Sequence, residues 1–114
     1  MSDATVDVET SPDGTIVIQP RGLLDADAAV ALRRTIVHAL RRTRPLRLVL
    51  DLRHLRDLDA INLGTLAEAC HLGDDHRVAV FLDHSSRALA DRLTAAGVPG
   101  HRLRHIDSRA ADVT

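Results

Sequence analysis

The 114-residue sequence predicts a single α/β domain built on a mixed, mostly parallel β-sheet. The first observation behind this prediction is a pair of short segments, joined by a turn, in which apolar and polar residues alternate. That pattern is typical of an antiparallel hairpin. The second observation is that short apolar runs then alternate with stretches of helical periodicity, which favours parallel strands connected by crossover helices. The predicted order of elements is therefore ββαβαβαβ.

The opening hairpin occupies residues 5–19. Residues 5–9 alternate apolar and polar side chains, as a half-buried strand does. The segment Ser11-Pro12-Asp13-Gly14 favours a turn, because proline fixes φ and glycine permits positive φ. Residues 15–19 form the second strand, and we expect Pro20-Arg21-Gly22 to end it.

The first helix follows that strand. Asp25 or Asp27 can cap it, because a carboxylate there accepts from unpaired backbone N–H groups. The helix is expected to close near Thr43, since Pro45 disfavours helical geometry in Arg44. Apolar residues at helical spacing predict its inward face: Ala26, Ala29, Val30, Ile36, Val37 and Leu40.

The middle of the chain predicts a strand, a loop and a second helix. Residues 46–52 are a short, nearly continuous apolar run, as in a central strand. After a polar loop, an i, i+3, i+4, i+7 set defines a helix that we expect to end at Gly73: Leu63, Leu66, Ala67 and Cys70. Residues 77–82 then predict another buried strand.

The last part of the chain predicts a third helix and an edge strand. Ser85 or Ser86 can cap this helix, and Gly97 can stop it. Its inward residues are expected to be Leu89, Leu93 and Ala96. Residues 103–106 form the edge strand, and residues 107–114 are expected to fray, which leaves a core of about residues 5–106.

Composition excludes several classes of protein. The formal net charge is −1, and all 15 basic residues are arginine. Phe81 is the only Phe, Trp or Tyr residue, so the core should be aliphatic. The chain therefore lacks the aromatic side chains on which nucleic-acid bases usually stack. The lone Cys70 suits a reducing compartment, and no apolar run approaches transmembrane length. We therefore expect a cytoplasmic protein that neither inserts into membranes nor binds nucleic acid.

No motif in the sequence indicates catalysis or a cofactor. There is no glycine-rich phosphate loop and no nucleophile elbow. The seven histidines fall on different elements, and only Cys70-His71 and His76 lie close together, a spacing that matches no compact zinc pattern. We therefore expect no enzyme activity, no metal and surface positions for the histidines: 38, 54, 71, 76, 84, 101 and 105.

A cluster of arginines lies late in the first helix and just after it: Arg33, Arg34, Arg41, Arg42, Arg44 and Arg47. Cations at that end complement the negative end of the helix dipole, which explains them sufficiently. If the cluster also binds something, an acidic protein is favoured over nucleic acid, because the chain has neither a large positive excess nor base-reading aromatics.

Two loops at the ends of strands stand out, residues 22–25 and 57–64, because open α/β sheets place function there. The turn Gly22-Leu23-Leu24-Asp25 precedes the first helix, and Asp59-Ala60-Ile61-Asn62-Leu63-Gly64 precedes the second. Together with Ala96-Gly97-Val98 and the order of elements, they resemble the STAS family over roughly residues 5–106. That resemblance implies a non-catalytic, protein-binding module like the anti-sigma factor antagonists.

The resemblance also implies a missing switch. In the antagonists the second turn reads Asp-Ser-Ser/Thr-Gly-Leu-Gly, and the partner, an anti-sigma factor of the histidine-kinase-like ATPase type, phosphorylates the first serine. Here Asp59, Leu63 and Gly64 match, whereas Ala60 stands at the phosphoacceptor position. Ile61 and Asn62 replace the next two residues of the pattern. The nearest hydroxyl belongs to Thr65, for which an ordinary exposed helix position is favoured over a phosphosite.

The partner-binding residues implied by the resemblance are Asp25, Asp59, Ala60, Ile61, Asn62, Leu63 and Gly64. Some have simpler explanations that the sequence leaves open: the two aspartates can serve only as helix caps, and Ile61 can pack under the preceding loop. The alternative function is a scaffold subunit of a stressosome-like or transporter-associated complex, which needs no acceptor serine. The identity of the partner and the formation of a homodimer are also left open.

Overall fold

The computed structural model describes residues 4–107. Its strands and helices are β1 (Thr5–Thr10), β2 (Ile16–Leu24), α1 (Ala26–His38), β3 (Arg47–Asp51), β4 (Leu55–Leu58), α2 (Ala60–Asp75), β5 (Ala79–Asp83), α3 (Arg87–Ala95) and β6 (Leu103–Arg104). The sheet order is β1-β2-β3-β5-β6, with β4 paired to β2. Only β1 and β2 pair antiparallel, so the predicted fold class and opening hairpin are confirmed.

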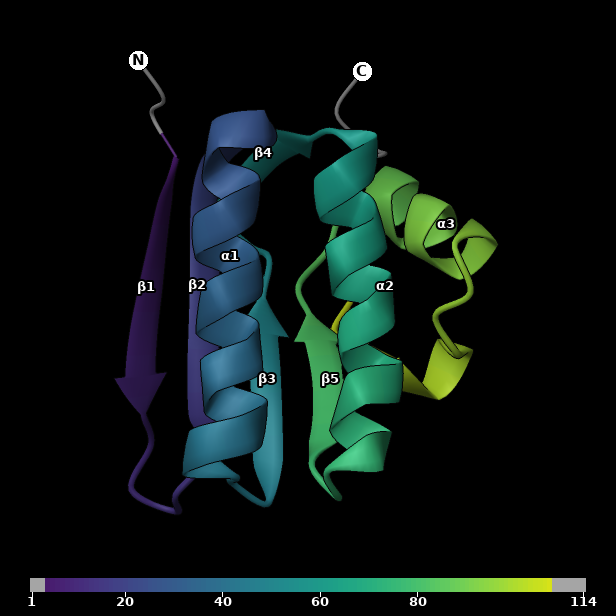
Figure 1. Ribbon diagram of the computed structural model, residues 1–114. Coiled ribbons are helices and arrows are strands. Elements are labelled where there is room, and N and C mark those ends of the chain that lie inside the picture. The colour runs from purple at the N-terminus through teal and green to yellow at the C-terminus, as the bar shows by residue number, and fades with distance from the viewer. Residues whose placement is uncertain (1–3, 108–114) are drawn as a thin grey trace.

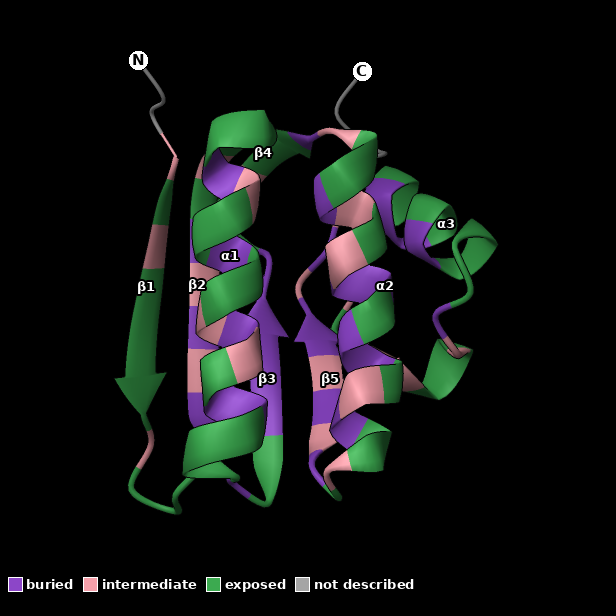
Figure 2. Cartoon of the chain, viewed as in Figure 1, coloured by how far each residue is buried: buried purple, intermediate pink, exposed green. Residues whose placement is uncertain are grey.

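The helices lie mainly on one side of this sheet. Figure 1 shows α1 and α2 side by side over the strands, with α3 beyond β5. Figure 2 shows that the buried residues of α1 and α2 face the sheet and that β1 is largely exposed. The core between these layers is aliphatic, as composition predicted, with fully buried Ile18, Leu32, Leu48, Leu50, Leu66 and Leu82.

Strand β2 is longer than predicted. It runs through Pro20 and Gly22 to Leu24, so the expectation that this segment ends the strand was wrong. Residues 16–18 pair with β3, whereas residues 22–24 pair with β4. Pro20 falls between these two parallel ladders, where its missing N–H removes no bond from either of them.

Strand β4 replaces part of the predicted polar loop. Only the first and last of its four residues are apolar, so the sequence shows no alternation that would predict a strand. Of the four, only Leu58 is buried. Pairing with the end of β2 holds it in place. The observed order is therefore ββαββαβαβ, one strand more than the sequence predicted.

Helix α1 begins and ends as expected. The Asp25 side chain accepts from the Ala28 N–H at 3.1 Å, which settles the choice of cap. A π-helical turn, Ala39–Thr43, completes the helix, and Arg44 then adopts a left-handed conformation with φ 49°. Proline at position 45 explains the stop, because it disfavours helical geometry in the preceding residue.

The inward face of α1 was predicted only in part. Ile36 and Leu40 are buried as expected, whereas Ala26 and Val30 are exposed. The buried residues recur every four positions: Ala28, Leu32, Ile36 and Leu40. The predicted set combined residues from two faces, because alanine occurs on both and short apolar residues mark a face weakly.

Helix α2 begins at Ala60, directly after the expected cap Asp59, and runs past Gly73 to Asp75. Gly73 therefore does not stop it. This glycine is instead the point of closest approach to β5, since an added Cβ would overlap the Val80 side chain and lie 2.7 Å from the Val78 carbonyl oxygen. Close packing against the sheet, not helix termination, explains a glycine at this position.

Helix α3 is capped by Ser86, whose hydroxyl oxygen accepts from the Leu89 N–H at 3.1 Å. Gly97 ends it with φ 106°, as predicted. Ala96 is exposed rather than inward, because the chain turns there and buries Val98 instead. The expected edge strand is reduced to two residues, Leu103–Arg104.

The predicted frayed tail lies mostly outside the described residues. Its first residue, Asp107, is held against the fold, since its N–H donates to the Ser85 carbonyl oxygen at 2.8 Å.

Candidate functional site

The two turns singled out from the sequence meet at one edge of the sheet. Gly22 has φ 84°, and the pairing register shifts between Gly22 and Leu23. Such a bulge turns the end of β2 away from β3 and toward β4. Because β2 and β4 run parallel, their carboxyl ends, and the helices that follow them, emerge together (Figure 1).

Each turn ends in an aspartate that caps the helix after it. Asp25 caps α1, and Asp59 caps α2 by accepting from the Asn62 N–H at 3.0 Å. The Asp59 N–H also donates to the Leu24 carbonyl oxygen at 3.0 Å, which continues the pairing of β4 with β2. Capping is therefore an observed function of both aspartates, and a contact with a partner is an additional role that capping leaves open.

Asn62 ties the two turns together. Its Nδ2 donates to the carbonyl oxygens of Leu24 and Asp25, at 3.1 and 2.9 Å, and to Asp59 Oδ1 at 2.8 Å. The side chain is fully buried, so it presents no surface to a partner. The expectation that Asn62 contacts a partner is therefore replaced by a structural role: it holds the starts of α1 and α2 together.

The other predicted residues of the second turn do reach the surface. Ala60 and Gly64 are exposed, and Ile61 is 62% exposed. Leu63 is half-buried against the core. This exposure shows that Ile61 does not pack under the preceding loop, which would have buried its side chain. An isoleucine left so exposed is unusual, because isoleucine is among the residues most often buried.

Thr65 lies one turn further along α2. It is half-buried, and its hydroxyl donates to the Ile61 carbonyl oxygen at 3.1 Å. A hydroxyl bonded back into its own helix is the ordinary arrangement for a helical threonine. The structure offers no feature that would distinguish Thr65 as a phosphosite.

Two further apolar residues near this end are exposed, and neither was predicted as a site residue. Leu23, in the bulged end of β2, is 48% exposed, and Val30, in the second turn of α1, is 61% exposed. We call the exposed residues at the start of α2, Ala60, Ile61 and Gly64, the helix-entry corner. The sequence did not indicate that Val30 is exposed, because its apolar side chain was assigned to the inward face of α1.

The helix-entry corner is held from behind by α3. Arg92 donates to the Leu58 carbonyl oxygen at 3.2 Å and to Asp57 Oδ1 at 3.3 Å. These bonds join the end of β4 to a third helix, so the start of α2 is supported by β2, α1 and α3 together. A supported corner presents its apolar side chains in a fixed arrangement, which lowers the entropy lost on binding.

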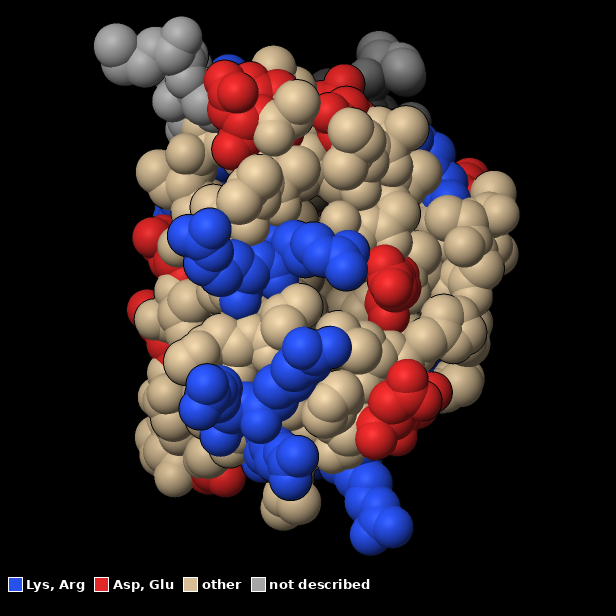
Figure 3. Space-filling view, viewed as in Figure 1, with Lys and Arg blue, Asp and Glu red and all other residues tan. Residues whose placement is uncertain are grey.

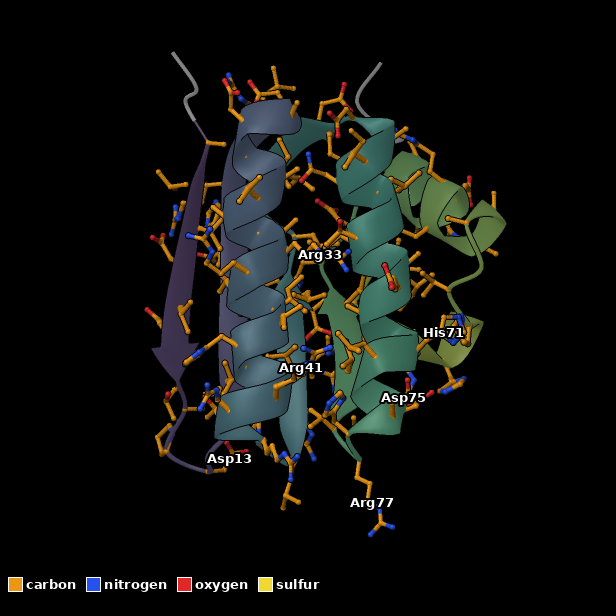
Figure 4. The ribbon with its side chains drawn as sticks, in the orientation of Figure 1. Asp13, Arg33, Arg41, His71, Asp75 and Arg77 are labelled. Atoms are coloured by element: carbon orange, nitrogen blue, oxygen red, sulfur yellow. The ribbon has the colours of Figure 1, made fainter. Side chains whose placement is uncertain are left out.

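The arginine cluster lies along the same side of the molecule, beyond the corner. Figure 3 shows acidic atoms over the starts of the two helices, uncharged surface below them, and arginine across α1. Figure 4 shows Arg33 and Arg41 on the side of α1 that faces α2. Arg33 pairs with Glu68 at 3.5 Å, whereas the other five arginines of the cluster have no ion pair among the described residues: Arg34, Arg41, Arg42, Arg44 and Arg47.

The chemistry of the buried polar groups is structural. Burial raises the pKa of the Cys70 thiol to about 11, so it stays protonated and unreactive at neutral pH.

Within residues 4–107, no three His, Cys, Asp or Glu side chains are close enough together to hold a metal ion. In the same part of the chain, no helix is both long enough and apolar enough to cross a membrane.

Solved structures share this fold. The phosphorylated form of the Bacillus cell fate determinant SpoIIAA is 18% identical, with a TM-score of 0.74 over 95% of this chain and 97% of that one. An anti-sigma factor antagonist from Mycobacterium paratuberculosis is 22% identical, with a TM-score of 0.75 over 96% and 91%. A sulfate transporter family protein from Wolinella succinogenes is 19% identical, with a TM-score of 0.66 over 87% and 84%.

Sequence comparison identifies the family. None of the curated proteins matches the chain at the level of sequence. The family model of the STAS domain matches residues 6–111, which is nearly the whole chain, and the structural neighbours include several anti-sigma factor antagonists. This protein belongs to the STAS domain family and has the fold of the anti-sigma factor antagonists.

Proposed function

We propose that this protein is a non-catalytic, cytoplasmic signalling module that binds an anti-sigma factor of the histidine-kinase-like ATPase type through the helix-entry corner. The observation that carries the proposal is the exposure of Ile61, at 62%, in the first turn of α2. When a partner covers an exposed isoleucine side chain at the start of a helix, the burial of its apolar surface stabilises the complex. Apolar anchors of this kind dominate the energy of protein interfaces.

The position of Ala60 supports constitutive binding. Ala60 is the first residue of α2, directly after the cap Asp59. A phosphate at a helix start is tolerated by the free N–H groups and adds nearly two negative charges to the surface. The SpoIIAA neighbour has been solved in a phosphorylated form. Since alanine has no hydroxyl, phosphorylation at this position cannot turn off binding, and control falls to the partner.

The test is a pair of charge insertions in the helix-entry corner. Ala60→Asp and Ile61→Asp should each weaken capture of the anti-sigma kinases of the same genome by at least about tenfold, because they place a charge in a desolvated contact. Both residues are exposed, so the melting temperature should change little. Ala88→Asp is the matched control, since Ala88 is also exposed in the first turn of a helix, α3.

The outcomes separate cleanly. Capture of no anti-sigma kinase by the folded wild-type protein would contradict the proposed partner. Undiminished capture by both corner variants would remove the helix-entry corner from the interface, and equal weakening by Ala88→Asp would show that the added charge acts without regard to place.

A scaffold role in a transporter-associated complex is the second candidate. The observation that favours it is the sulfate transporter family protein among the structural neighbours. Such a role requires no acceptor serine and therefore also accommodates Ala60. Permease genes beside the coding sequence, and a large assembly in light scattering, would favour this candidate over an antagonist that binds one kinase.

A further inference from the structure

Three histidines that are far apart in the sequence converge on one depression. His54, His84 and His105 line it together with Arg53, Ile106 and Asp107, and its volume is about 560 Å³. The rings of His84 and His105 are stacked, with centroids 5.4 Å apart and planes inclined by 22°. We call these six residues the histidine depression. The helix-entry corner includes none of them.

The depression lies where an open α/β sheet binds ligands. His54 comes shortly after β3, His84 directly after β5 and His105 directly after β6, and these three strands are parallel neighbours. The depression therefore sits at the carboxyl ends of three adjacent strands, the edge at which ligands bind in sheets of this type. The three histidines follow three different strands, so only the folded sheet brings them together.

The backbone at two of these histidines is unusual. His84 has φ 62° and His105 has φ 54°, a left-handed conformation that non-glycine residues seldom adopt. The His84 N–H donates to the Arg104 carbonyl oxygen at 3.0 Å, which holds the two strand exits together and helps keep the rings stacked. Strained positions of this kind cluster at sites that bind ligands.

The charges around the depression determine what it can bind. Arg53 is paired with Asp51 at 3.0 Å, and Asp83 is paired with Arg104 at 2.8 Å, so these four groups nearly cancel. Asp107 adds a carboxylate at the rim. Net positive charge therefore has to come from the three imidazoles, each of which donates two N–H groups when protonated. Two stacked imidazolium rings repel each other unless an anion lies beside them.

We propose that the histidine depression is a pH-dependent binding site for a tetrahedral oxyanion, a phosphate or sulfate group. Imidazolium and guanidinium groups that converge from several strand ends match an acceptor with oxygens on several sides. A metal site fits less well, because no three histidine, cysteine or carboxylate side chains are close enough to bind one ion in the part of the chain from residue 4 to 107. The site does not depend on the proposed partner.

Sulfate is the first probe, because its charge stays constant over the range in which imidazole titrates. The full chain is titrated with sodium sulfate at constant ionic strength, once at about pH 5.5 and once at about pH 7.5, and the histidine ring signals are followed by NMR. The signals of His54, His84 and His105 should shift saturably at the lower pH. Affinity should be lower at the higher pH, because a charged imidazolium ring binds an anion more strongly than a neutral ring does.

Variants assign the site. Asparagine tolerates the left-handed backbone, so the double variant His84→Asn, His105→Asn should keep the fold and lose sulfate binding. His54→Gln, in an exposed turn, is a second variant that should weaken binding without touching the strained positions. His71→Ala is the control, because His71 is exposed on α2 and does not line the depression.

Further ligands distinguish the source of the anion. Inorganic phosphate and glycerol phosphate should both bind; equal affinities indicate a site for the free ion, and tighter binding of the ester indicates a phosphorylated metabolite. Acetate should bind at least several-fold more weakly than sulfate. The proposal is overturned if sulfate shifts no histidine signal, if the double variant binds as well as the wild type, or if these histidines bind Zn²⁺ and not sulfate.

Discussion

At the scale of single residues, Asn62 is the side chain that joins the two turns of the site. Its Nδ2 spans the end of β2, the cap of α1 and the cap of α2. Its Oδ1 is buried without a hydrogen-bond partner among the described residues. The side chain therefore works as a donor, and an acceptor-only replacement would be unfavourable here.

Asn62→Ala should lower the free energy of unfolding by about 1–3 kcal/mol, because it removes three hydrogen bonds of the buried side chain at the two turns and leaves the space of the amide unfilled. Asn62→Asp should cost more, since it buries a carboxylate where donors are needed. Urea denaturation measures both changes. Thr65→Ala, half-buried in the same helix with its hydroxyl bonded to the backbone of that helix, is the control and should cost less, about 0.5 kcal/mol. Equal effects of Asn62→Ala and Thr65→Ala would contradict the bridging role.

Asp51 makes stability depend on pH. Burial raises the pKa of this carboxyl, but hydrogen bonds from the Arg53 N–H groups and from Gln19 Nε2 outweigh burial and lower the pKa below its usual range. Because the folded pKa is the lower one, the stabilisation is fully present above about pH 4 and is lost as the pH falls through the folded pKa.

Asp51→Asn should therefore destabilise the protein by roughly 1–3 kcal/mol at neutral pH, through loss of charged hydrogen bonds. The difference from the wild type should shrink as the pH falls well below about 4, where Asp51 itself is protonated. Denaturant titrations at a series of pH values measure it. A difference that stays constant down to the lowest pH would show that ionised Asp51 contributes nothing.

At the scale of elements, α2 combines two glycines with opposite roles. Gly73 lies against β5, where a Cβ would overlap Val80. Gly64 is exposed in the second turn of the helix and has open space around it, with nothing within 4 Å of an added Cβ. Gly73 is needed for helix–sheet contact, whereas packing within the domain does not require a glycine at position 64, where glycine weakens the helix.

Gly73→Ala should destabilise the domain by about 1–3 kcal/mol, because the helix must move away from the sheet. Gly64→Ala should stabilise it by up to about 1 kcal/mol, because alanine restricts the unfolded chain and favours the helix. Thermal unfolding of the two variants provides a matched comparison in one helix. Shifts of the same sign would contradict the assigned packing.

At the scale of the whole molecule, the partner change of β2 organises the site. Its first half pairs with β3 and builds the core, and its second half pairs with β4 and brings the two helix starts together. At the acceptor position, the corner formed there differs from the antagonist pattern by one hydroxyl, because alanine stands at position 60; Ile61 and Asn62 depart from the pattern as well. The difference at position 60 can be reversed by one substitution.

Ala60→Ser should restore a regulated molecule if the proposed function holds. Incubation with the cognate anti-sigma kinase and ATP should phosphorylate the serine variant but not the wild type at this position, as intact-mass measurement would show. Partner binding by the phosphorylated form should fall by at least about tenfold. A variant that is phosphorylated yet binds undiminished would place the acceptor position outside the interface.

Much of the fold could be predicted from local patterns. Turn chemistry at Pro12 and Gly14, the caps at Asp25 and Asp59, and the stop at Gly97 are all set by residues within a few positions of each other. The same holds for the end of α1 before Pro45. Parallel pairing followed from the alternation of strands and helices, because crossovers need that spacing.

Other features depended on contacts between distant segments. Strand β4 forms only because the end of β2 is there to pair with it, and Asn62 is buried only because two turns 37 residues apart meet over it. The histidine depression is another case, since His54, His84 and His105 appear scattered in the sequence. Local patterns determined most of the elements and the helix caps. Only the tertiary structure decided which residues are neighbours. Crossover connections and sheet pairing bring together segments that are far apart in the sequence, and neither segment's sequence indicates its partner.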